Sequence, residues 1–581
     1  MTDVRLTPWA AVPALALGLL SAGCRTPADH RRLADENAAR VIQSAREDLQ
    51  GAGAPVLVVE RPADTLRRRL LIDQESTPGA EPPASPAANS AAERLTLVQA
   101  LAAGAQNNNE YQARKEAVFR AALRLNVAEE GFANSWAGVL VGEAQENRSG
   151  DDTVRGVSGR ASPAVQRLLR GGALVSAQVA VDLVKLLTLE KPSSLGLVAD
   201  LSVTVPLLRG AGRAVVTEPL TQAERNLVYA LLEFERFKQA FVVRVASQYF
   251  GTMEQQQRAR NARDNLERLR LARQLAESLG QSGRLPEIQV DQARQDELRA
   301  RERLLQAESA VARSLDELKL TLGLPVDAEI EIDPDEIQRF TDAAATARTG
   351  RPDAPDTESD AAGEAGPYEL DVAVAIGLAL ERRPDLTITR GRLEDARRAL
   401  VVAEDALRAG LKLEVKGAAG ESRSYGSADR DDAELRPDRG VYTARLTSDL
   451  PWRRVDERRA YREQLLAIDE AERAVEQAED QVKAQVRDNL RALALARESY
   501  RIQQLALDVA QRRVESSEMF LQAGRVQIRD VLEAQEALLN ALNAVTAVTV
   551  NYRLAELALQ RDMAVLEVDD EGRWREFVIN E

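Results

Sequence analysis

Two very long helical segments constrain this chain more than any other feature of its sequence. Apolar residues recur at spacings of three and four from about 219 to 279, and again from about 455 to 521. A pattern sustained this long is typical of coiled coils, and at 1.5 Å per residue each helix is about 90 to 100 Å long. No compact globular domain needs helices of that length, so the pattern predicts a tube or a stalk.

Each long helix belongs to a unit that occurs twice. In both copies a strand pattern precedes the helix, a glycine-arginine turn follows it, and a shorter helix returns and ends near 322 or 565. The turns are Gly283-Arg284 and Gly524-Arg525. Equivalent positions are roughly 240 residues apart, far more than the 20 to 50 residues of a solenoid repeat, so the chain is a doubled unit.

Two regions have the period of two that predicts β-strands. The first, 136–208, is longer than the second, 411–450, so we expect an extra hairpin or an ordered loop within it. Shorter helical patterns at 93–134 and 371–409 have a suitable length to stack end to end with the two return helices. Four strands per chain are expected in total.

The N-terminus has the pattern of a bacterial lipoprotein leader. Arg5 precedes an apolar stretch, and Leu20-Ser21-Ala22-Gly23-Cys24 follows the lipobox pattern, in which the chain is cut before the cysteine. We therefore expect lipidation of Cys24; the alternative is a small hydrophobic residue at this position by chance. Arg25 after the cysteine, rather than Asp, favours the outer membrane.

These patterns together divide the chain into six segments. The expected segments are a lipoprotein signal peptide (1–23), a lipid-anchored flexible tether (24–92), a first repeat (93–340), a linker (341–367), a second repeat (368–565) and a C-terminal tail (566–581).

Composition excludes several classes of function. The formal net charge of -15 argues against a nucleic-acid partner. The single Cys and the single His, His30 in the leader region, leave no disulfide, thiolate cluster or histidine-based triad for the body of the chain. We expect no catalysis, no cofactor and no metal.

No stretch of about 18 apolar residues follows Cys24, so a membrane crossing would need β-strands in a closed barrel.

Three motifs carry a resemblance to a known family. They are Pro206-Leu-Leu-Arg-Gly-Ala-Gly-Arg213, Arg383-Pro-Asp-Leu386 and Ala523-Gly-Arg-Val-Gln-Ile-Arg-Asp-Val-Leu-Glu-Ala534. With the doubled unit, they resemble outer membrane efflux proteins of the TolC family over about 93–565, and the lipobox resembles the lipoprotein branch (outer membrane factor lipoproteins).

The resemblance implies an α+β fold of two tandem strand–long-helix repeats. It also implies a homotrimer, in which the strands form one outer-membrane β-barrel that is continued by a periplasmic α-helical coiled-coil barrel. The expected partners are a periplasmic adaptor (membrane fusion) protein, an inner-membrane pump and outer membrane lipid. Independently, four strands cannot close a barrel, whereas three chains would supply about twelve.

The resemblance also implies functional residues. Asp530 and Glu533 match two acidic residues that line the family's periplasmic entrance, and Gly283, Arg284, Gly524 and Arg525 match the turns on which an adaptor docks. A spacing of three places Asp530 and Glu533 on one helix face, where symmetry would repeat them as an acidic ring. The alternative is that two acids merely complement the helix dipole and that the turns are plain turns. The equivalents in the first copy are Gln289 and Gln292, with Asp291 off that face.

The sequence therefore predicts the channel component of a tripartite efflux pump or a type I secretion system, passively conducting what an inner-membrane pump exports. The alternative is a structural periplasmic coiled-coil lipoprotein that scaffolds the envelope. The two strand regions at matching places favour the channel, because a scaffold needs neither of them.

Overall fold

The computed structural model describes residues 26–50, 57, 65–75, 93–149, 152–187, 193–333, 370–450, 452–523 and 525–575. The chain divides into two compact units, and each is built from three separate segments. The first unit comprises 1–56, 118–230 and 389–475, and the second comprises 57–117, 231–388 and 476–581. The expected signal peptide and the linker 341–367 lie outside the described residues.

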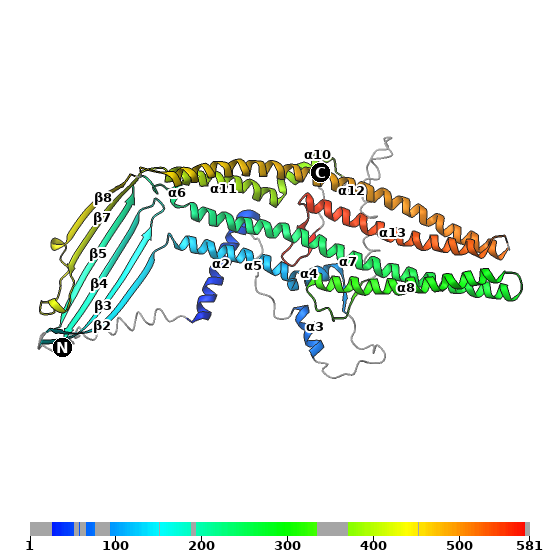
Figure 1. Ribbon diagram of the computed structural model, residues 1–581, viewed down its shortest axis with the longest axis horizontal. Helices are drawn as coiled ribbons and strands as arrows, with labels where there is room; N and C mark the ends of the chain where they lie inside the picture. Colours follow the sequence, from blue (N-terminus) through cyan, green and yellow to red (C-terminus); the bar gives the residue numbers. More distant parts are fainter. Residues whose placement is uncertain are drawn as a thin grey trace, which may run out of the picture. The chain divides into compact units, whose positions relative to one another are not determined.

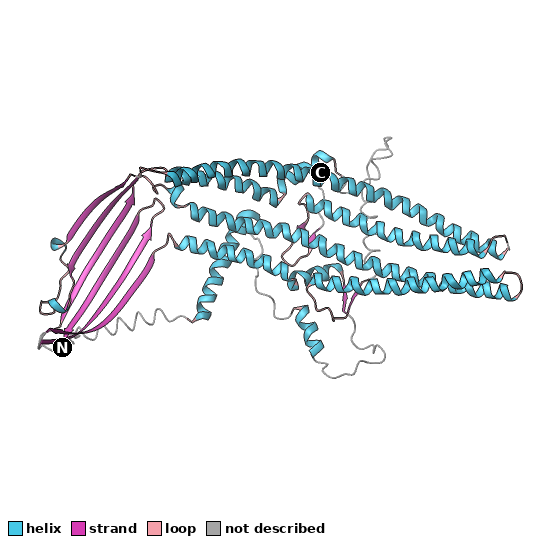
Figure 2. Cartoon of the chain, in the orientation of Figure 1, coloured by secondary structure: helices cyan, strands magenta, loops and turns pink. Residues whose placement is uncertain are grey.

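A six-stranded antiparallel sheet dominates the first unit (Figure 2). Its strands, in spatial order, are β2 (Ser135–Ser149), β3 (Asp152–Leu168), β4 (Leu174–Leu186), β5 (Ser194–Pro206), β7 (Gly410–Glu421) and β8 (Val441–Asp449). The count of four strands is wrong, whereas the extra hairpin expected within 136–208 is confirmed, because β2 pairs with β3 there. Both strands are rich in Gly, Ala, Ser and Arg, which have weak strand propensity, so their pairing is poorly signalled in the sequence.

All helical connections of the first unit lie at one end of this sheet (Figure 1). There α5 (Asn109–Glu130) leads into β2, β5 leads through α6 (Arg213–Val216) into α7 (Glu218–Gln281), α11 (Pro384–Ala406) leads into β7, and β8 leads into α12 (Val455–Gln522). The N–H of Gly210 donates to the Asp405 carboxylate at 2.6 Å, and Arg209 pairs with Asp449 at 2.9 Å. The turns between strand and helix are therefore tied to one another.

Two long helical hairpins form the main part of the second unit, as predicted. They are α7 with α8 (Glu287–Leu322), and α12 with α13 (Ile528–Asp562). Ala293 and Ala534, each ten residues after its turn glycine, are fully buried. Ala293 packs in a cluster with α7 and α13, and Ala534 packs against α12. Small side chains at these positions let the helices approach closely, which explains the repeated Gly-Arg…Ala spacing.

Shorter helices continue the return helices, but each predicted single helix is broken once. The segment 93–134 contains β1 (Glu93–Leu95), α4 (Leu97–Asn107) and α5, and 371–409 contains α10 (Val372–Arg382) and α11. Arg383 is extended because a proline follows it, and Pro384 begins α11 where its missing N–H costs nothing. At the first break, the Asn108 amide donates to the Thr321 carbonyl at 2.8 Å and so joins α8 to α4.

The segment expected to be a flexible tether has helices in its described parts, so that expectation is wrong there. They are α2 (Pro27–Gln50) and α3 (Leu66–Glu75). Thr26 and Asp29 exchange hydrogen bonds at the start of α2, which satisfies free N–H groups of its first turn. Ala38, Ile42 and Arg46 then form a buried stripe with the helical spacing of four.

The expected C-terminal tail is also folded where it is described. Strands β9 (Glu567–Val568) and β10 (Trp574–Arg575) form a small hairpin in the second unit. The Lys238 ammonium, only 2% exposed, holds this hairpin by donating to the Val568 carbonyl and the Asp570 carboxylate, both at 3.1 Å. A buried ammonium needs such partners, and the sequence does not reveal them.

A second small sheet pairs β1 with β6 (Ile330–Ile332).

Candidate functional site

The sheet of the first unit has two chemically different faces. Strand pairing places Trp136, Val165, Ala177, Leu201, Gly417 and Tyr442 in one row across all six strands. Because side chains alternate along a strand, every second residue shares the face of this row, which we call the apolar face. On β4 and β5 every member of this face is apolar, except at the end of β4 that is remote from the helices. These apolar residues are Val175, Ala177, Val179, Val181, Leu183, Leu195, Leu197, Ala199, Leu201, Val203 and Val205.

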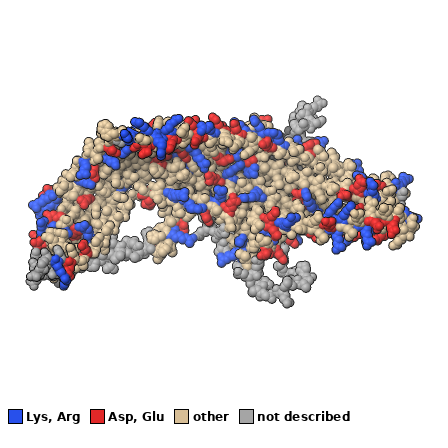
Figure 3. All heavy atoms as spheres, in the orientation of Figure 1, with Lys and Arg blue, Asp and Glu red and all other residues tan. Residues whose placement is uncertain are grey.

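Charged residues occur on the apolar face only near the strand ends. Arg155, Lys185 and Glu421 lie at the end remote from the helices, and Arg167 lies near the helical end. In Figure 3 the part of the sheet in view is mostly uncharged, and charged atoms gather towards the remote end. The middle of this face is therefore an apolar band.

The opposite face, which we call the polar face, carries hydroxyl and charged groups. Arg160 and Asp182 form an ion pair at 2.5 Å, and the hydroxyls of Ser176 and Ser202 lie 2.7 Å apart. Lys416 and Arg445 extend this face over β7 and β8. A sheet with one apolar and one polar face can separate lipid from water.

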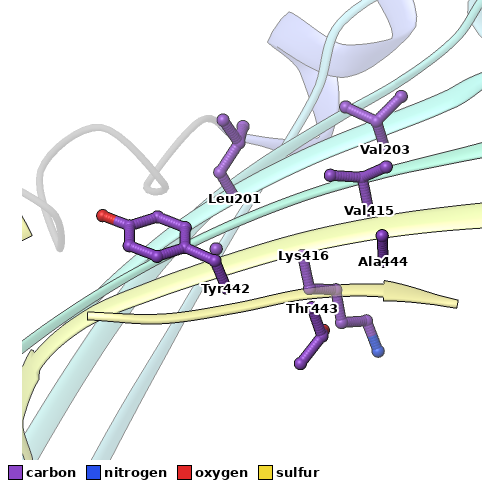
Figure 4. Close-up of a pocket in the computed structure, with 8 residues that line it drawn as sticks. Leu201, Val203, Val415, Lys416, Tyr442, Thr443 and Ala444 are labelled. Carbon is purple, nitrogen blue, oxygen red and sulfur yellow. The ribbon is translucent and has the colours of Figure 1, made fainter.

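A hollow on the sheet shows the two faces side by side (Figure 4). Leu201, Val203 and Tyr442 point to one side of the strands, whereas Lys416 and Thr443 point to the other. Its lining comes from three neighbouring strands and holds no cluster of titratable groups. It is an indentation in the apolar band rather than a catalytic pocket.

The segment 422–440 between β7 and β8 folds onto the polar face at its remote end. The Tyr425 ring packs with Val184, Leu186 and Ala428. Its hydroxyl lies 3.2 Å from both the Glu143 carbonyl and the Ser158 hydroxyl. We call this segment the inner loop; its acidic, glycine-containing sequence does not reveal that it packs on the sheet.

The two hairpin turns share an equivalent backbone hydrogen bond. The N–H of Arg284 donates to the Leu279 carbonyl, and the N–H of Arg525 donates to the Phe520 carbonyl, both at 2.9 Å. Gly283 has a φ of 70°, the left-handed conformation that favours glycine. Gly524 lies outside the described residues. Both arginine side chains are exposed, so the two turns present the same basic group.

The acidic pair on α13 is exposed at the start of that helix. Asp530 accepts from the N–H of Gln527 at 3.0 Å and so caps α13. Glu533 pairs with Arg513 of α12 at 3.3 Å. One turn further, Glu536 pairs with Arg303 of α8 at 2.7 Å. The sequence motif did not reveal these arginines, because they lie on other helices.

The remaining predictions about sites concern lipid and metal. Cys24 lies outside the described residues. In the part of the chain that the structure describes, no group of three or more His, Cys, Asp or Glu side chains is arranged to hold a metal ion. None of the helices described here is both long enough and apolar enough to cross a membrane.

Comparison with solved structures shows the same fold in outer-membrane channels. The outer-membrane channel OprN is 15% identical, with a TM-score of 0.55 over 80% of this chain and 89% of its own. CusC is 14% identical, with a TM-score of 0.55 over 84% and 98%. The open state of MtrE from Neisseria gonorrhoeae is 12% identical, with a TM-score of 0.54 over 80% and 88%.

Sequence comparison gives the family. No curated protein matches the chain. The sequence profile described as "Outer membrane efflux protein" matches residues 162–324 and 375–564, which is more than half of the chain and includes both long helical hairpins. This protein therefore belongs to the outer membrane efflux protein family, the TolC family of outer-membrane transport channels.

Proposed function

We propose that this protein is the outer-membrane channel of a tripartite efflux pump or a type I secretion system, and that it passively conducts what an inner-membrane pump exports. The observation that carries the proposal is the sheet, which is apolar on one face, polar on the other, and joined to helices at one end. On β4, Val175 to Leu183 covers about 27 Å of strand, or about 21 Å of height at a tilt of about 40°, close to the apolar band of outer-membrane barrels.

The chain acts as a homotrimer in this proposal. One six-stranded sheet has two open edges, so it encloses a water-filled path only when other copies complete a shared β-barrel. The helices of the two repeats, 93–340 and 368–565, form the periplasmic α-helical barrel. The exposed side chains of Leu495, Ile502 and Val509 support lateral assembly, because they recur every seven residues on α12 as an unpartnered coiled-coil seam does.

The hairpin turns are the docking site for a periplasmic adaptor protein in this proposal, and the inner-membrane pump is reached through that adaptor. Gly283 and Gly524 shape the turns, and Arg284 and Arg525 contact the adaptor. The equivalent backbone hydrogen bond of the two turns and the exposure of both arginines support the assignment. Reversing both charges with Arg284→Glu and Arg525→Glu should abolish export while the purified channel keeps its conductance; unchanged export would remove these contacts.

Lipidation of Cys24 is part of the proposal and would anchor the chain to the outer membrane. The rival function, a periplasmic scaffold held only by lipid, does not require a sheet whose apolar band is close in height to that of outer-membrane barrels. The family to which the chain belongs also consists of channels rather than scaffolds or enzymes.

The mass of the detergent-extracted particle, measured by light scattering with the detergent subtracted, tests the proposal. We expect three chains per particle, recovered from the membrane fraction. A monomer or dimer that stays soluble without detergent would overturn the channel and restore the scaffold.

As a matched assembly variant, Ile502→Asp on the exposed seam should weaken the trimer, whereas Asp480→Asn on the same helix should leave it intact.

A further inference from the structure

Both edges of the sheet are open in a single chain. β2 and β8 each pair with one strand only, and no other described strand lies along their outer edges. Every residue of β8 is exposed, as is every residue of β2 whose burial is described. Such edges present unpaired N–H and C=O groups, which cannot be satisfied inside a bilayer unless another strand pairs with them.

The added hairpin belongs to the same wall as the other four strands. On the apolar face, β2 contributes Trp136, Gly138 and Leu140, and β3 contributes Val157 and Val165. Trp136, Leu140 and Val157 are among the exposed large apolar side chains of the chain. A hairpin folded into the lumen would not need an apolar face that continues the band of β4 and β5.

The number and direction of the strands permit closure between identical copies. All neighbours in the sheet are antiparallel and the strands are six, so β2 and β8 run in opposite directions. β8 of one copy can therefore pair antiparallel with β2 of the next, and every pairing in a ring of copies stays antiparallel.

The register of the sheet also fits a closed barrel. The row that starts at Ser135, the first residue of β2, ends at Thr443 of β8, six residues from Asp449 at the helical end. Six residues of about 3.3 Å over five steps of about 4.8 Å correspond to a strand tilt of about 40°. Closed barrels have tilts of about 35 to 45°, so the sheet already has the stagger that closure requires.

We propose that β8 of each copy pairs antiparallel with β2 of the next copy, and that three copies close a barrel of eighteen strands rather than the twelve that the sequence suggested. The inference rests on the proposed function, because it needs the trimeric channel. At about 4.8 Å between strands and a tilt of about 40°, eighteen strands make a barrel about 36 Å across, and twelve make one of about 24 Å. The cross-section is then about twofold larger.

The pairing can be tested by cysteine cross-linking in the full chain. Continuing the stagger places Thr447 opposite Ala137 or Val139 of the next copy, with all three side chains on the polar face. Thr447→Cys combined with Ala137→Cys or with Val139→Cys should give disulfide-linked trimers on oxidation. A twelve-stranded barrel would instead place β4 at the edge, so Thr447→Cys with Ser176→Cys is the competing pair.

Two controls make the result decisive. Thr447→Cys alone should give no linked trimer, and Ser176→Cys with Ser202→Cys, whose hydroxyls lie 2.7 Å apart within one chain, should form a disulfide without linking chains. Two results in a particle of three chains would overturn the eighteen-stranded barrel. One is that Thr447→Cys links only to Ser176→Cys, and the other is that it links to none of these partners. Neither result would contradict the channel function. A particle that is not a trimer would overturn both.

Discussion

At the scale of single residues, Asp530 has a structural role that can be separated from its charge. Its carboxylate caps α13 through the N–H of Gln527, so replacement by alanine would remove both a cap and a charge. Asp530→Asn keeps an oxygen that can accept this bond. Combined with Glu533→Gln, it should lower the cation selectivity or raise the ion conductance of the reconstituted channel, because an acidic ring attracts cations.

The first repeat provides the matched control for this prediction. Asp291→Asn on α8 also removes an exposed acid near a hairpin turn, but from the other repeat and off the predicted face. Conductance and selectivity should be unchanged in this variant. If the double variant on α13 behaves like Asp291→Asn, the acidic pair is a helix cap and a surface ion pair, and the gate assignment is wrong.

Asp562 holds a buried charge network at the end of α13. Its carboxylate, 4% exposed, accepts from Arg236 and from Arg561 at 2.9 Å and from Asn489 at 2.6 Å. Asp562→Ala leaves the Arg236 guanidinium largely buried without its carboxylate, which typically costs about 3 kcal/mol or more. We expect a markedly lower thermal denaturation temperature in detergent, and little change for the exposed Asp480→Asn.

The same network makes stability depend on acid pH. Burial opposes ionisation of Asp562, but the hydrogen bonds and charges of Arg561 and Arg236 outweigh it and lower its pKa below the ordinary value of 3.8. A carboxyl whose pKa is depressed by folding adds stability above its unfolded pKa and loses it as the pH falls through the folded value. Denaturation temperatures of the wild type and Asp562→Asn should therefore converge below about pH 4. A constant difference down to about pH 2 would contradict this.

At the scale of elements, the inner loop depends on one aromatic side chain. A Cβ added at Gly156 would lie 2.4 Å from the Tyr425 ring, so that glycine makes room for the ring. Tyr425→Ala and Gly156→Ala should both release the loop, because both remove its packing on the polar face. Trypsin should then cut at Arg430 or Arg439 faster than in the wild type.

Tyr425→Phe separates packing from hydrogen bonding in this experiment. It keeps the ring and loses only the bonds to the Glu143 carbonyl and the Ser158 hydroxyl. We expect cleavage close to the wild-type rate, since an individual neutral hydrogen bond contributes about 1 kcal/mol. Equal cleavage of the wild type and both alanine variants would show that other contacts hold the loop.

Elements with a strong period could be predicted from the sequence, and elements held by distant contacts could not. The helices α7, α8, α12 and α13 follow from apolar spacing alone. A turn at Gly283 could be predicted because glycine favours the left-handed conformation, which it adopts there. The length of 136–208 predicted an extra hairpin or an ordered loop, and the structure shows the hairpin β2–β3 there. Its two strands were not assigned from the sequence, because their residues favour no local structure. The C-terminal hairpin was missed because its partner, Lys238, lies more than 300 residues away in sequence.

Candidate site residues were predictable to the same limited extent. The motif around Asp530 and Glu533 is local, so their exposure on α13 could be expected from their spacing. Their partners are not local: Arg513 lies on α12, and nothing in the sequence relates it to Glu533. The two faces of the sheet could be predicted only in part. Apolar and polar residues alternate clearly in β5, but the strand register is needed to show that one apolar face extends from β2 to β8.

At the scale of the whole molecule, two independent features could hold the protein in the membrane. One is the proposed lipid on Cys24, and the other is the apolar band of the sheet. If residues 1–24 are replaced by a cleavable signal peptide without a lipobox, the channel proposal predicts that the protein still resists extraction by alkaline carbonate, because burial of the band contributes about 25 cal/mol per Å² of apolar surface.

A second variant shows which feature is responsible. Leu201→Asp with Val179→Asp places charges in the middle of the apolar band on two neighbouring strands. A carboxylate on the lipid face is destabilising, although it costs less than the about 2 to 4 kcal/mol of an Arg or Lys at the bilayer midplane. With the lipid site intact, this variant should remain membrane-associated but become extractable by carbonate and lose its trimer. The control, Ser176→Asp on the polar face of β4, should keep both properties, because its charge would face water rather than lipid. If the variant without the lipobox, which lacks Cys24, is instead released from the membrane, the lipid is the only anchor, as the scaffold function predicts.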